Sequence, residues 1–369
     1  MEYKRLGDYI EPVDERNSKL EIKLSQGISN EKYFQNPRQV AENSAADKIV
    51  RRGYFAYNRA TTRNGEKISI AYREGPDCTV SSAYQVFRIK DEEKLNPKYL
   101  LMWYKRPDFD RYARFKSHGS AHEFFEYDEM CDVYLPLPDI DRQREIVEEY
   151  ETLSRRIRLN EQMIEKLEAT AQALYRKMFV DGIDKENLPE GWRMGTLGEI
   201  ANCYDFKRRP LSEDERKSMK GFYPYYGAMS VVDHINQYIF DGTFLLFSED
   251  GANVIDEYGH PALQYLWGKF WVNNHAHVLQ GNEIVSTEYL YMALKGVNAT
   301  HLVTGAAQPK INQENMNSIP LVIPSAEEMT KYNEFMKPIF SYYKLATEEN
   351  SKLSELQSLL LAKMGNLKQ

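Results

Sequence analysis

Several features are scarce or missing in this sequence, and each absence excludes a class of protein. The three cysteines are isolated and lack metal-ligand spacing, so we expect ordinary reduced thiols. No apolar run approaches the roughly 20 residues of a membrane span, and residues 1–10 lack the regions of a signal peptide. We therefore expect a folded, soluble, cytoplasmic protein without membrane contact.

An excess of basic residues is also missing. The formal net charge is −7, and it is unevenly distributed. Residues 1–138 hold 23 basic against 22 acidic residues, net +1; residues 139–186 (9 against 12), 187–324 (10 against 15) and 325–369 (6 against 6) carry −3, −5 and 0. No segment has the charge of a protein that binds DNA phosphates tightly alone. If DNA is the ligand, a partner must neutralise many of the phosphates.

Motifs of catalysis are missing as well. The sequence has no Walker loop, no glycine-rich dinucleotide turn, and no Asn-Pro-Pro-Tyr or Asp-Pro-Pro-Tyr run that holds a flipped adenine. Glu21 and Lys23 make a fragment of a nuclease motif, but no Pro-Asp pair precedes them, which favours a strand edge. His275 and His277 share one face of a strand without further ligands nearby, so we favour structural or DNA-contacting roles. We expect a non-catalytic chain without a metal.

What the sequence does contain is an internal repeat at an offset of 186 residues. Gly119 corresponds to Gly305 and Met178 to Met364, and the roughly sixty residues between them align without a gap. A duplicated globule followed by a duplicated helix implies approximate internal two-fold symmetry, and such proteins usually read a bipartite ligand.

The repeated helix has apolar residues in alternating steps of four and three, which is typical of a coiled-coil seam. The seam comprises Ile146, Tyr150, Leu153, Ile157, Asn160, Ile164, Leu167, Ala171, Leu174 and Met178, and then Tyr332, Met336, Ile339, Tyr343, Ala346, Asn350, Leu353, Gln357, Leu360 and Met364. Asp139 and Ser325 are placed to cap the two helices, and Gly182 and Gly365 to stop them.

Both seams contain an asparagine, Asn160 and Asn350. A polar residue at one core position fixes register and partner; the alternative is a partly exposed end of the seam. Because a whole globule separates the helices in the sequence, we expect them to pair antiparallel. Such a rod of roughly 55 Å would be a spacer with one globule at each end.

Each globule mixes strand-like and helical segments. Residues 53–57, 68–72 and 84–89 predict strands and Pro97 begins a helix; residues 242–247 and 288–292 are the matching strand and helix. Here the offset drifts to about 189 or 190, as expected when the frame is structural and the loops are selective. The expected fold is α+β: two mixed α/β domains (1–138 and 187–324), each followed by a long helix (139–186 and 325–369), with the helices forming an antiparallel coiled coil.

Short motifs recur in order along this frame. Domain openings are Leu188, Pro189, Glu190, Gly191 and Trp192 followed by Leu197, Gly198, Glu199 and Ile200, and, in the first copy, Leu6, Gly7, Asp8 and Tyr9. The first junction with a helix is Leu135, Pro136, Leu137 and Pro138 followed by Arg142, Gln143, Glu145 and Ile146. The second domain adds Tyr223 to Gly227, Tyr238 to Gly242, and Glu249 to Gly251. With these motifs the whole chain resembles the specificity subunit of Type I restriction-modification systems, although residues 323–329 lack the family's glutamine after the proline.

The resemblance implies a non-catalytic subunit whose two target-recognition domains read a bipartite, asymmetric site on double-stranded DNA. It also implies partners: two modification (methyltransferase) subunits that methylate adenine, and restriction subunits that translocate DNA and cleave it. S-adenosylmethionine, ATP and Mg would be bound by those partners and not by this chain. The alternative is an adaptor of another defence complex whose globules bind protein. A basic, loop-lined concave face on both domains, aligned to one duplex, would favour DNA, and apolar patches on the loops would favour protein.

Candidate recognition residues lie in loops, where Arg can bind guanine, Asn adenine, and small residues permit close backbone approach. The first domain offers Asn58, Arg59, Arg63, Asn64 and Lys67, and a second loop with Lys116, His118, Gly119, Ser120 and His122. The second domain offers Lys207, Arg208, Arg209, Tyr226, Ser230 and Asn253, and the counterpart loop with Gly305, Gln308 and Lys310. The alternative for residues 58–67 is a solvated turn, and for residues 207–209 it is a solvated charge run. For Tyr226 the alternative is packing in the core.

Overall fold

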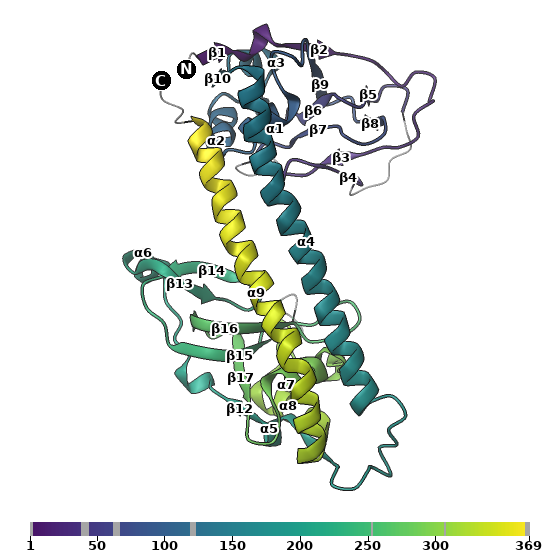
Figure 1. The fold of residues 1–369 in the computed structure, drawn as a ribbon, viewed down its shortest axis with the longest axis vertical. Helices are drawn as coiled ribbons and strands as arrows, with labels where there is room; N and C mark the ends of the chain where they lie inside the picture. The colour runs from purple at the N-terminus through teal and green to yellow at the C-terminus, as the bar shows by residue number, and fades with distance from the viewer. Residues whose placement is uncertain are drawn as a thin grey trace. The chain divides into compact units, whose positions relative to one another are not determined.

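The protein is described by a computed structural model that covers residues 3–37, 44–61, 67–118, 123–251, 254–305 and 308–365 (Figure 1). The chain forms two compact units. Unit 1 comprises residues 1–160 and 348–369, and unit 2 comprises residues 161–347. None of the helices in the described ranges has the length and apolar character needed to cross a membrane.

Unit 1 is built around a four-stranded antiparallel sheet in the order β2-β9-β6-β7. Its strands are β1 (Tyr3–Arg5), β2 (Ile10–Val13), β3 (Gly27–Ile28), β4 (Phe34–Gln35), β5 (Lys48–Val50), β6 (Phe55–Asn58), β7 (Ile70–Tyr72), β8 (Cys78–Val80), β9 (Tyr84–Ile89) and β10 (Tyr134–Pro136). Its short helices are η1 (Leu6–Asp8), α1 (Pro97–Tyr104), α2 (Pro107–Phe115) and α3 (Tyr127–Cys131). Phe55 and Phe87 stack at 5.1 Å on the buried face, where Tyr104 of α1 meets them edge-on.

Unit 2 contains a six-stranded sheet in the order β12-β17-β15-β16-β13-β14, antiparallel except for the β13–β16 pair. Its strands are β11 (Arg193–Thr196), β12 (Ala201–Cys203), β13 (Lys220–Tyr226), β14 (Val231–Ile235), β15 (Phe240–Ser248), β16 (Leu263–Val272), β17 (Ala276–Gly281) and β18 (Pro320–Ile323). Its short helices are α5 (Leu197–Ile200), η2 (Asp205–Lys207), α6 (Glu213–Ser218), α7 (Thr287–Lys295), η3 (Thr300–Leu302) and α8 (Gln313–Asn317). The predicted strands at 84–89 and 242–247 and the helix at 288–292 lie within β9, β15 and α7.

Two helices of 40 residues each, α4 (Ile140–Phe179) and α9 (Ala326–Gly365), contribute to both units. Their first and last residues are related by the predicted offset of 186, and so are those of α3 and α8. Strands β10 and β18 begin at the same offset. Each pairs antiparallel with the first strand of its own domain, β10 with β1 and β18 with β11. The sequence repeat is therefore a repeat of structure.

The predicted caps are present at the N-termini of both long helices, whereas the predicted glycine stops fit the C-termini less well. Asp139 Oδ1 accepts a hydrogen bond of 2.9 Å from the Arg142 N–H, and Ser325 Oγ accepts one of 3.3 Å from the Glu328 N–H. Helix α4 ends at Phe179, three residues before Gly182. Helix α9 includes Gly365, whereas the sequence predicts that the helix stops at this glycine.

The junction between domain and helix explains one motif residue. The buried Gln143 side chain donates to the carbonyls of Pro138 and Lys94 and accepts from the Asn96 N–H, which ties the first turn of α4 to the start of α1. At the equivalent position of α9 stands Met329, which packs in the apolar core of unit 2. The second junction thus replaces hydrogen bonds with apolar packing.

The long helices pack antiparallel, as predicted, and Figure 1 shows their segments side by side in each unit. In unit 1, Ile146 and Met364 share one core, and Gln357 Nε2 donates to Ser154 Oγ at 2.7 Å. In unit 2, the Phe179 ring meets the Tyr332 ring edge-on at 5.2 Å. All twenty predicted seam positions are buried or half-buried, whereas most of the intervening positions are exposed.

The seam asparagines bind each other inside unit 1. Asn160 is 1% exposed, and its Nδ2 donates at 2.9 Å both to Asn350 Oδ1 and to Glu349 Oε2. Asn350 Nδ2 donates to the Ile157 carbonyl, and Arg156 binds both oxygens of Glu349 at 2.9 Å. These cross-helix hydrogen bonds support the register-fixing role; for Asn160, which is buried, a partly exposed end of the seam is wrong, whereas Asn350 is half-buried.

We expect Asn160→Ala to lower the free energy of unfolding by about 1–3 kcal/mol, because it leaves Asn350 with an unmatched acceptor. The double variant Asn160→Leu/Asn350→Leu removes both polar groups and should be more stable than the single variant. Urea unfolding followed by circular dichroism measures the difference. A single variant as stable as the wild type would show that the pair contributes nothing to the register.

Candidate nucleic-acid interfaces

The two candidate loops of unit 1 come together, although they lie about sixty residues apart in the sequence. Ala60 pairs with Phe124, and Phe124 also pairs with His118. The Phe125 N–H donates to the Arg59 carbonyl at 2.9 Å. The segments 58–61, 116–118 and 123–125 therefore form one surface at the end of β6.

The same backbone arrangement occurs in unit 2. Asp250 pairs with Lys310, Lys310 pairs with Thr304, and the Ile311 N–H donates to the Glu249 carbonyl at 2.9 Å. His118 and Phe124 correspond to Thr304 and Lys310 at the offset of 186. The loop that the sequence repeat singled out thus has the same pairing in both copies.

Gly305 is required by this loop. Its φ is +85°, a left-handed conformation, and a Cβ on it would lie 2.4 Å from the Gln308 carbonyl oxygen. Gln308 is exposed at the end of the turn. The close approach of the Gln308 carbonyl therefore excludes a side chain at position 305.

The candidate side chains of unit 1 are engaged with neighbours. Asn58 Oδ1 accepts from the Ala60 N–H; Arg59 lies 3.3 Å from Glu126, Lys67 2.6 Å from Glu31, and Lys116 3.0 Å from Glu129. His118 lies 3.6 Å from the same Glu129, and the hydrogen bond to Glu129 raises the pKa of Lys116. Arg63, Asn64, Gly119, Ser120 and His122 lie outside the described residues. Each cation of this set that the structure describes faces a carboxylate.

In unit 2 the basic run 207–209 divides into an inner and an outer part. Arg208 points inward: its Nη1 donates to Glu249 at 2.6 Å and to the Ala276 carbonyl at 2.8 Å, and its Nη2 lies 3.0 Å from Asp205. Buried His277 completes the network, with Nδ1 at 2.5 Å from Asp205 and Nε2 at 2.9 Å from the Ile311 carbonyl. Arg208 therefore holds loops together and is not placed to bind phosphate directly.

The network changes the acidity of its carboxyl groups. Burial raises the pKa of Asp205, but the hydrogen bond from His277 and the charges of His277 and Arg208 outweigh it, so the pKa lies below its ordinary value. For Glu249, burial is likewise outweighed by hydrogen bonds from Arg208 and Lys310, and its pKa is also lowered. Both carboxyl groups therefore favour the charged form, through the buried Arg208 and His277 and the partly exposed Lys310.

Within the described ranges, Cys203, Asp205 and His277 place potential metal-ligand atoms within 4.8 Å of one another. The set does not fit a metal ion, because Arg208 already neutralises Asp205 and the Ile311 carbonyl takes His277 Nε2. Burial also raises the pKa of Cys203 to about 12, which keeps the thiol protonated. This cluster is an ionic network of the protein itself.

The charged side chains of this region are segregated by depth. The acids are inward, with side-chain exposures of 11% for Asp205, 12% for Glu249 and 17% for Asp250. Four bases are outward, with 67% for Arg209, 46% for Lys310 and 46% for His275, and with Lys207 exposed as well, whereas Arg208 and His277 are inward, with 13% and 1%. Lys310 pairs with Glu249 from outside at 2.9 Å, and Arg209 has Glu215 at 3.7 Å. Lys207, Arg209, Lys310 and His275 are thus exposed on these loops, with the exposed Glu215 of α6 beside Arg209.

The remaining candidates of unit 2 border this surface. The Tyr226 carbonyl accepts from the Asn273 N–H, while its ring meets Phe270 edge-on in the core. Ser230 is exposed in the β13–β14 turn, and Asn253 lies outside the described residues. The tyrosine is thus partly a core residue, and the serine side chain is free to contact a ligand.

The network gives His277 one of the roles that the sequence favours, a structural one, and it adds Asp205, which the sequence did not single out. Asp205 stands three residues before Arg208, and this spacing of opposite charges is a signal for a local ion pair. Nothing in the sequence indicates that His277 lies beside them, because His277 follows the 205–208 turn by 69 or more residues.

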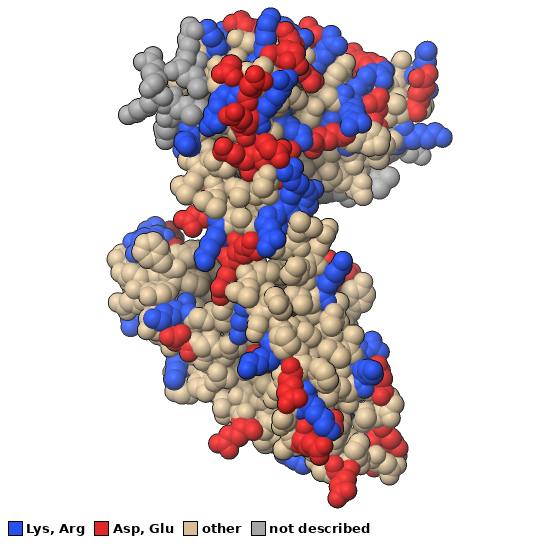
Figure 2. All heavy atoms as spheres, viewed as in Figure 1, with Lys and Arg blue, Asp and Glu red and all other residues tan. Residues whose placement is uncertain are grey.

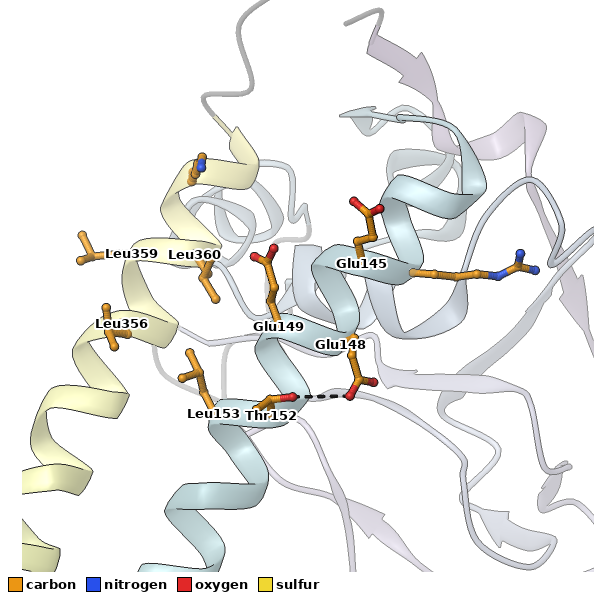
Figure 3. Close-up of a pocket in the computed structure, with 10 residues that line it drawn as sticks. Glu145, Glu148, Glu149, Thr152, Leu153, Leu356, Leu359 and Leu360 are labelled. Carbon is orange, nitrogen blue, oxygen red and sulfur yellow. Dashed lines mark hydrogen bonds between the residues drawn. The ribbon is translucent and has the colours of Figure 1, made fainter.

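A different surface lies on unit 1, where α4 and α9 leave a groove of about 900 Å³ between them. Figure 3 shows Leu153 of α4 and Leu360 of α9 pointing toward each other in this groove, with Leu356 beside them. Glu145 and Glu149 lie along the α4 side, and Lys363 closes the end of α9. The groove is apolar at its base and charged at its rim.

Figure 2 shows that the unit 1 face in view mixes acidic and basic side chains, whereas large areas of the unit 2 face carry none.

Comparisons with known proteins agree with this architecture. A family model, the Type I restriction modification DNA specificity domain, matches residues 18–169 and again residues 189–356. A putative type I restriction enzyme specificity subunit of Haemophilus influenzae is 34% identical over 150 residues, which are 40% of this chain and 37% of that protein. The HindI specificity subunit of the same species is 20% identical, with 87% of each chain covered.

The aligned part spans about a third of the first two relatives' own length, 37% for the protein above and 30% for the EcoDI specificity subunit of Escherichia coli. Among solved structures, the S subunit of a Type I restriction-modification system from M. genitalium has a similar fold. Its TM-score is 0.60 at 14% identity, with 99% of this chain and 96% of that chain covered.

Acid should destabilise unit 2 through Asp205 and Glu249. Because their folded-state pKa values lie below the ordinary 3.8 and 4.5, the stability they contribute is present above those values and is lost as the pH falls below about 4. Three of the four tryptophans (Trp192, Trp267 and Trp271) are in unit 2, so urea unfolding followed by tryptophan fluorescence reports on it. Asp205→Asn should be less stable at neutral pH and should flatten the acid limb; an identical acid limb would contradict this role.

Proposed function

Because the chain belongs to the Type I restriction modification DNA specificity family, we propose that it is the specificity subunit of a Type I restriction-modification complex, located in the cytoplasm. In this role it carries no catalytic site and recognises double-stranded DNA. Methylation and cleavage belong to the modification and restriction subunits, which bind S-adenosylmethionine, ATP and Mg.

The observation that carries this proposal is how the charged side chains of these unit 2 loops are divided between the interior and the surface. Asp205 and Glu249 lie inside the protein, where Arg208 binds both, and Lys207, Arg209 and Lys310 lie outside on the same loops. An outward basic surface formed by loops at one sheet end suits phosphates and base edges. It favours DNA over the alternative in which these loops bind a protein.

The two half-sites differ in this proposal because the equivalent residues of the two loop pairs differ. Arg59 and Phe124 of unit 1 take the backbone places of Glu249 and Lys310 of unit 2. The domains at 1–138 and 187–324 would each read one half of a bipartite target. The two domains share the backbone pairing of these loops, but the side chains that the loops carry differ.

The isolated chain should bind DNA weakly, because the described candidate cations of unit 1 are paired with acids and the net charge is −7. We expect a Kd weaker than about 1 μM at physiological salt for the chain alone. Adding the cognate modification subunit should strengthen binding and make it specific for one methylated motif. Fluorescence anisotropy with labelled duplexes, guided by sequencing of methylated bases in cells that carry the system, tests this. Tight and specific binding by the lone chain would contradict the division of labour.

The apolar groove on unit 1 is our proposed docking place for a modification subunit. Leu356 is exposed there on α9, and a helix from the partner could bury it between α4 and α9. The acidic rim formed by Glu145, Glu148 and Glu149 calls for basic residues on that helix.

Leu356→Lys should weaken association with the modification subunit by about tenfold or more, since truncated hot-spot contacts cost about 2 kcal/mol. Leu159→Lys is the matched control: Leu159 is an exposed leucine of α4 outside the groove, and its variant should associate like the wild type. Analytical ultracentrifugation of the mixed proteins gives both affinities. Equal affinities for the two variants would remove the groove from the interface.

A further inference from the structure

The turn that carries the basic run alternates between buried and exposed side chains. Asp205 and Arg208 are inward, in the ionic network, and the residues beside them are outward. Among these, Phe206 is 78% exposed, a large value for an aromatic side chain, and Lys207 is exposed next to it. With three residues per turn, η2 places 205 and 208 on one side and so directs 206 and 207 away from it.

Both ends of this turn are fixed to the sheet. Before it, the Tyr204 N–H donates to the Val278 carbonyl at 2.8 Å, and Asp205 Oδ1 accepts from the Val278 N–H at 2.9 Å. After it, the Arg209 carbonyl accepts from Trp271 Nε1 at 2.7 Å. Burying charges in this way costs desolvation free energy. The backbone on both sides of Phe206 is therefore fixed to the sheet.

The surroundings of Phe206 combine aromatic and basic groups. The Tyr204 ring lies 6.2 Å away, and Lys207 Nζ lies 5.8 Å from the Phe206 ring and 5.1 Å from the Tyr204 ring. No ion pair within 4 Å involves Lys207 in the described part of the chain. Exposed aromatics beside cations are the groups that bind bases and the phosphates next to them.

We propose that Phe206 stacks on a base of the DNA half-site read by unit 2, while Lys207 and Arg209 bind the flanking phosphates. This inference rests on the proposed function and adds a residue to it. Stacking requires a base that is at least partly unstacked from its neighbour, so unit 2 would distort its half-site at one step. Discrimination there would come from the deformability of that step as well as from base edges.

A second phenylalanine of unit 2 serves as the control. Phe222 is 94% exposed on β13, where a bulge turns it outward and the Gly221 backbone lies against Asn236. Its neighbour Lys220 is paired with Asp233 at 2.5 Å, and neither belongs to the ionic network or its loops. Phe206 and Phe222 thus differ in position and share residue type and exposure.

The experiment uses the full chain reconstituted with its modification subunits and duplexes that contain the motif methylated in cells. Duplexes with 2-aminopurine at successive positions of each half-site report unstacking by increased fluorescence. We expect the wild type to raise fluorescence at one step of one half-site, and Phe206→Ala to abolish that rise and weaken binding by about 5- to 100-fold. Phe206→Trp should keep both, Phe222→Ala should match the wild type, and Lys207→Gln should reduce the salt dependence of binding.

The outcomes separate the two levels of the proposal. If the wild-type complex neither binds nor methylates a defined motif, the proposed function fails. If it does both, and Phe206→Ala equals Phe222→Ala in binding and in 2-aminopurine fluorescence, the stacking role alone is overturned. Loss of the modification subunit from the Phe206→Ala complex, measured by size-exclusion chromatography, would assign Phe206 to a protein contact and also overturn it.

Discussion

Each unit of this protein depends on a helical segment supplied by the other half of the sequence. The core of unit 1, formed mostly before residue 160, includes Leu361 and Met364 of α9. The core of unit 2 includes Ala171, Tyr175 and Phe179 of α4, which pack against α7 and the start of α9. The antiparallel seam is therefore more than a connection, because apolar surface of both units is covered by it.

The sequence predicts this frame well, and the reason is physical. A seven-residue repeat over ten seam positions remains recognisable even where one position is polar. The first and last residues of α4 and α9 are related by the predicted offset of 186. The predicted strands are less accurate at their ends: β6 begins at Phe55 and not at Gly53, because pairing with β7 and β9 sets its length. Asn160 and Asn350 show the same contrast, since their seam position is visible in the sequence and their mutual hydrogen bond is not.

The recognition surfaces could be predicted only in part. The loop containing Gly305 stands out because it keeps the repeat offset and because its left-handed turn needs glycine. The run Lys207, Arg208 and Arg209 reads as one basic patch, yet the tight turn sends Arg208 inward to Asp205 and Glu249. A count of charges along the chain has no access to depth, and depth is what separates the buried Arg208 from the exposed Lys207 and Arg209.

The supply of a late helical segment to unit 1 has a consequence for synthesis on the ribosome. Unit 1 lacks residues 348–369 until almost the whole chain has been made, nearly 190 residues after Asn160. At about 5–20 residues per second this delay is on the order of 10–40 s. During that time the inner face of α4, with Ile146, Leu153 and Ile157, has no covering helix, and a nascent chain in this state is a natural client for chaperones that bind apolar helices.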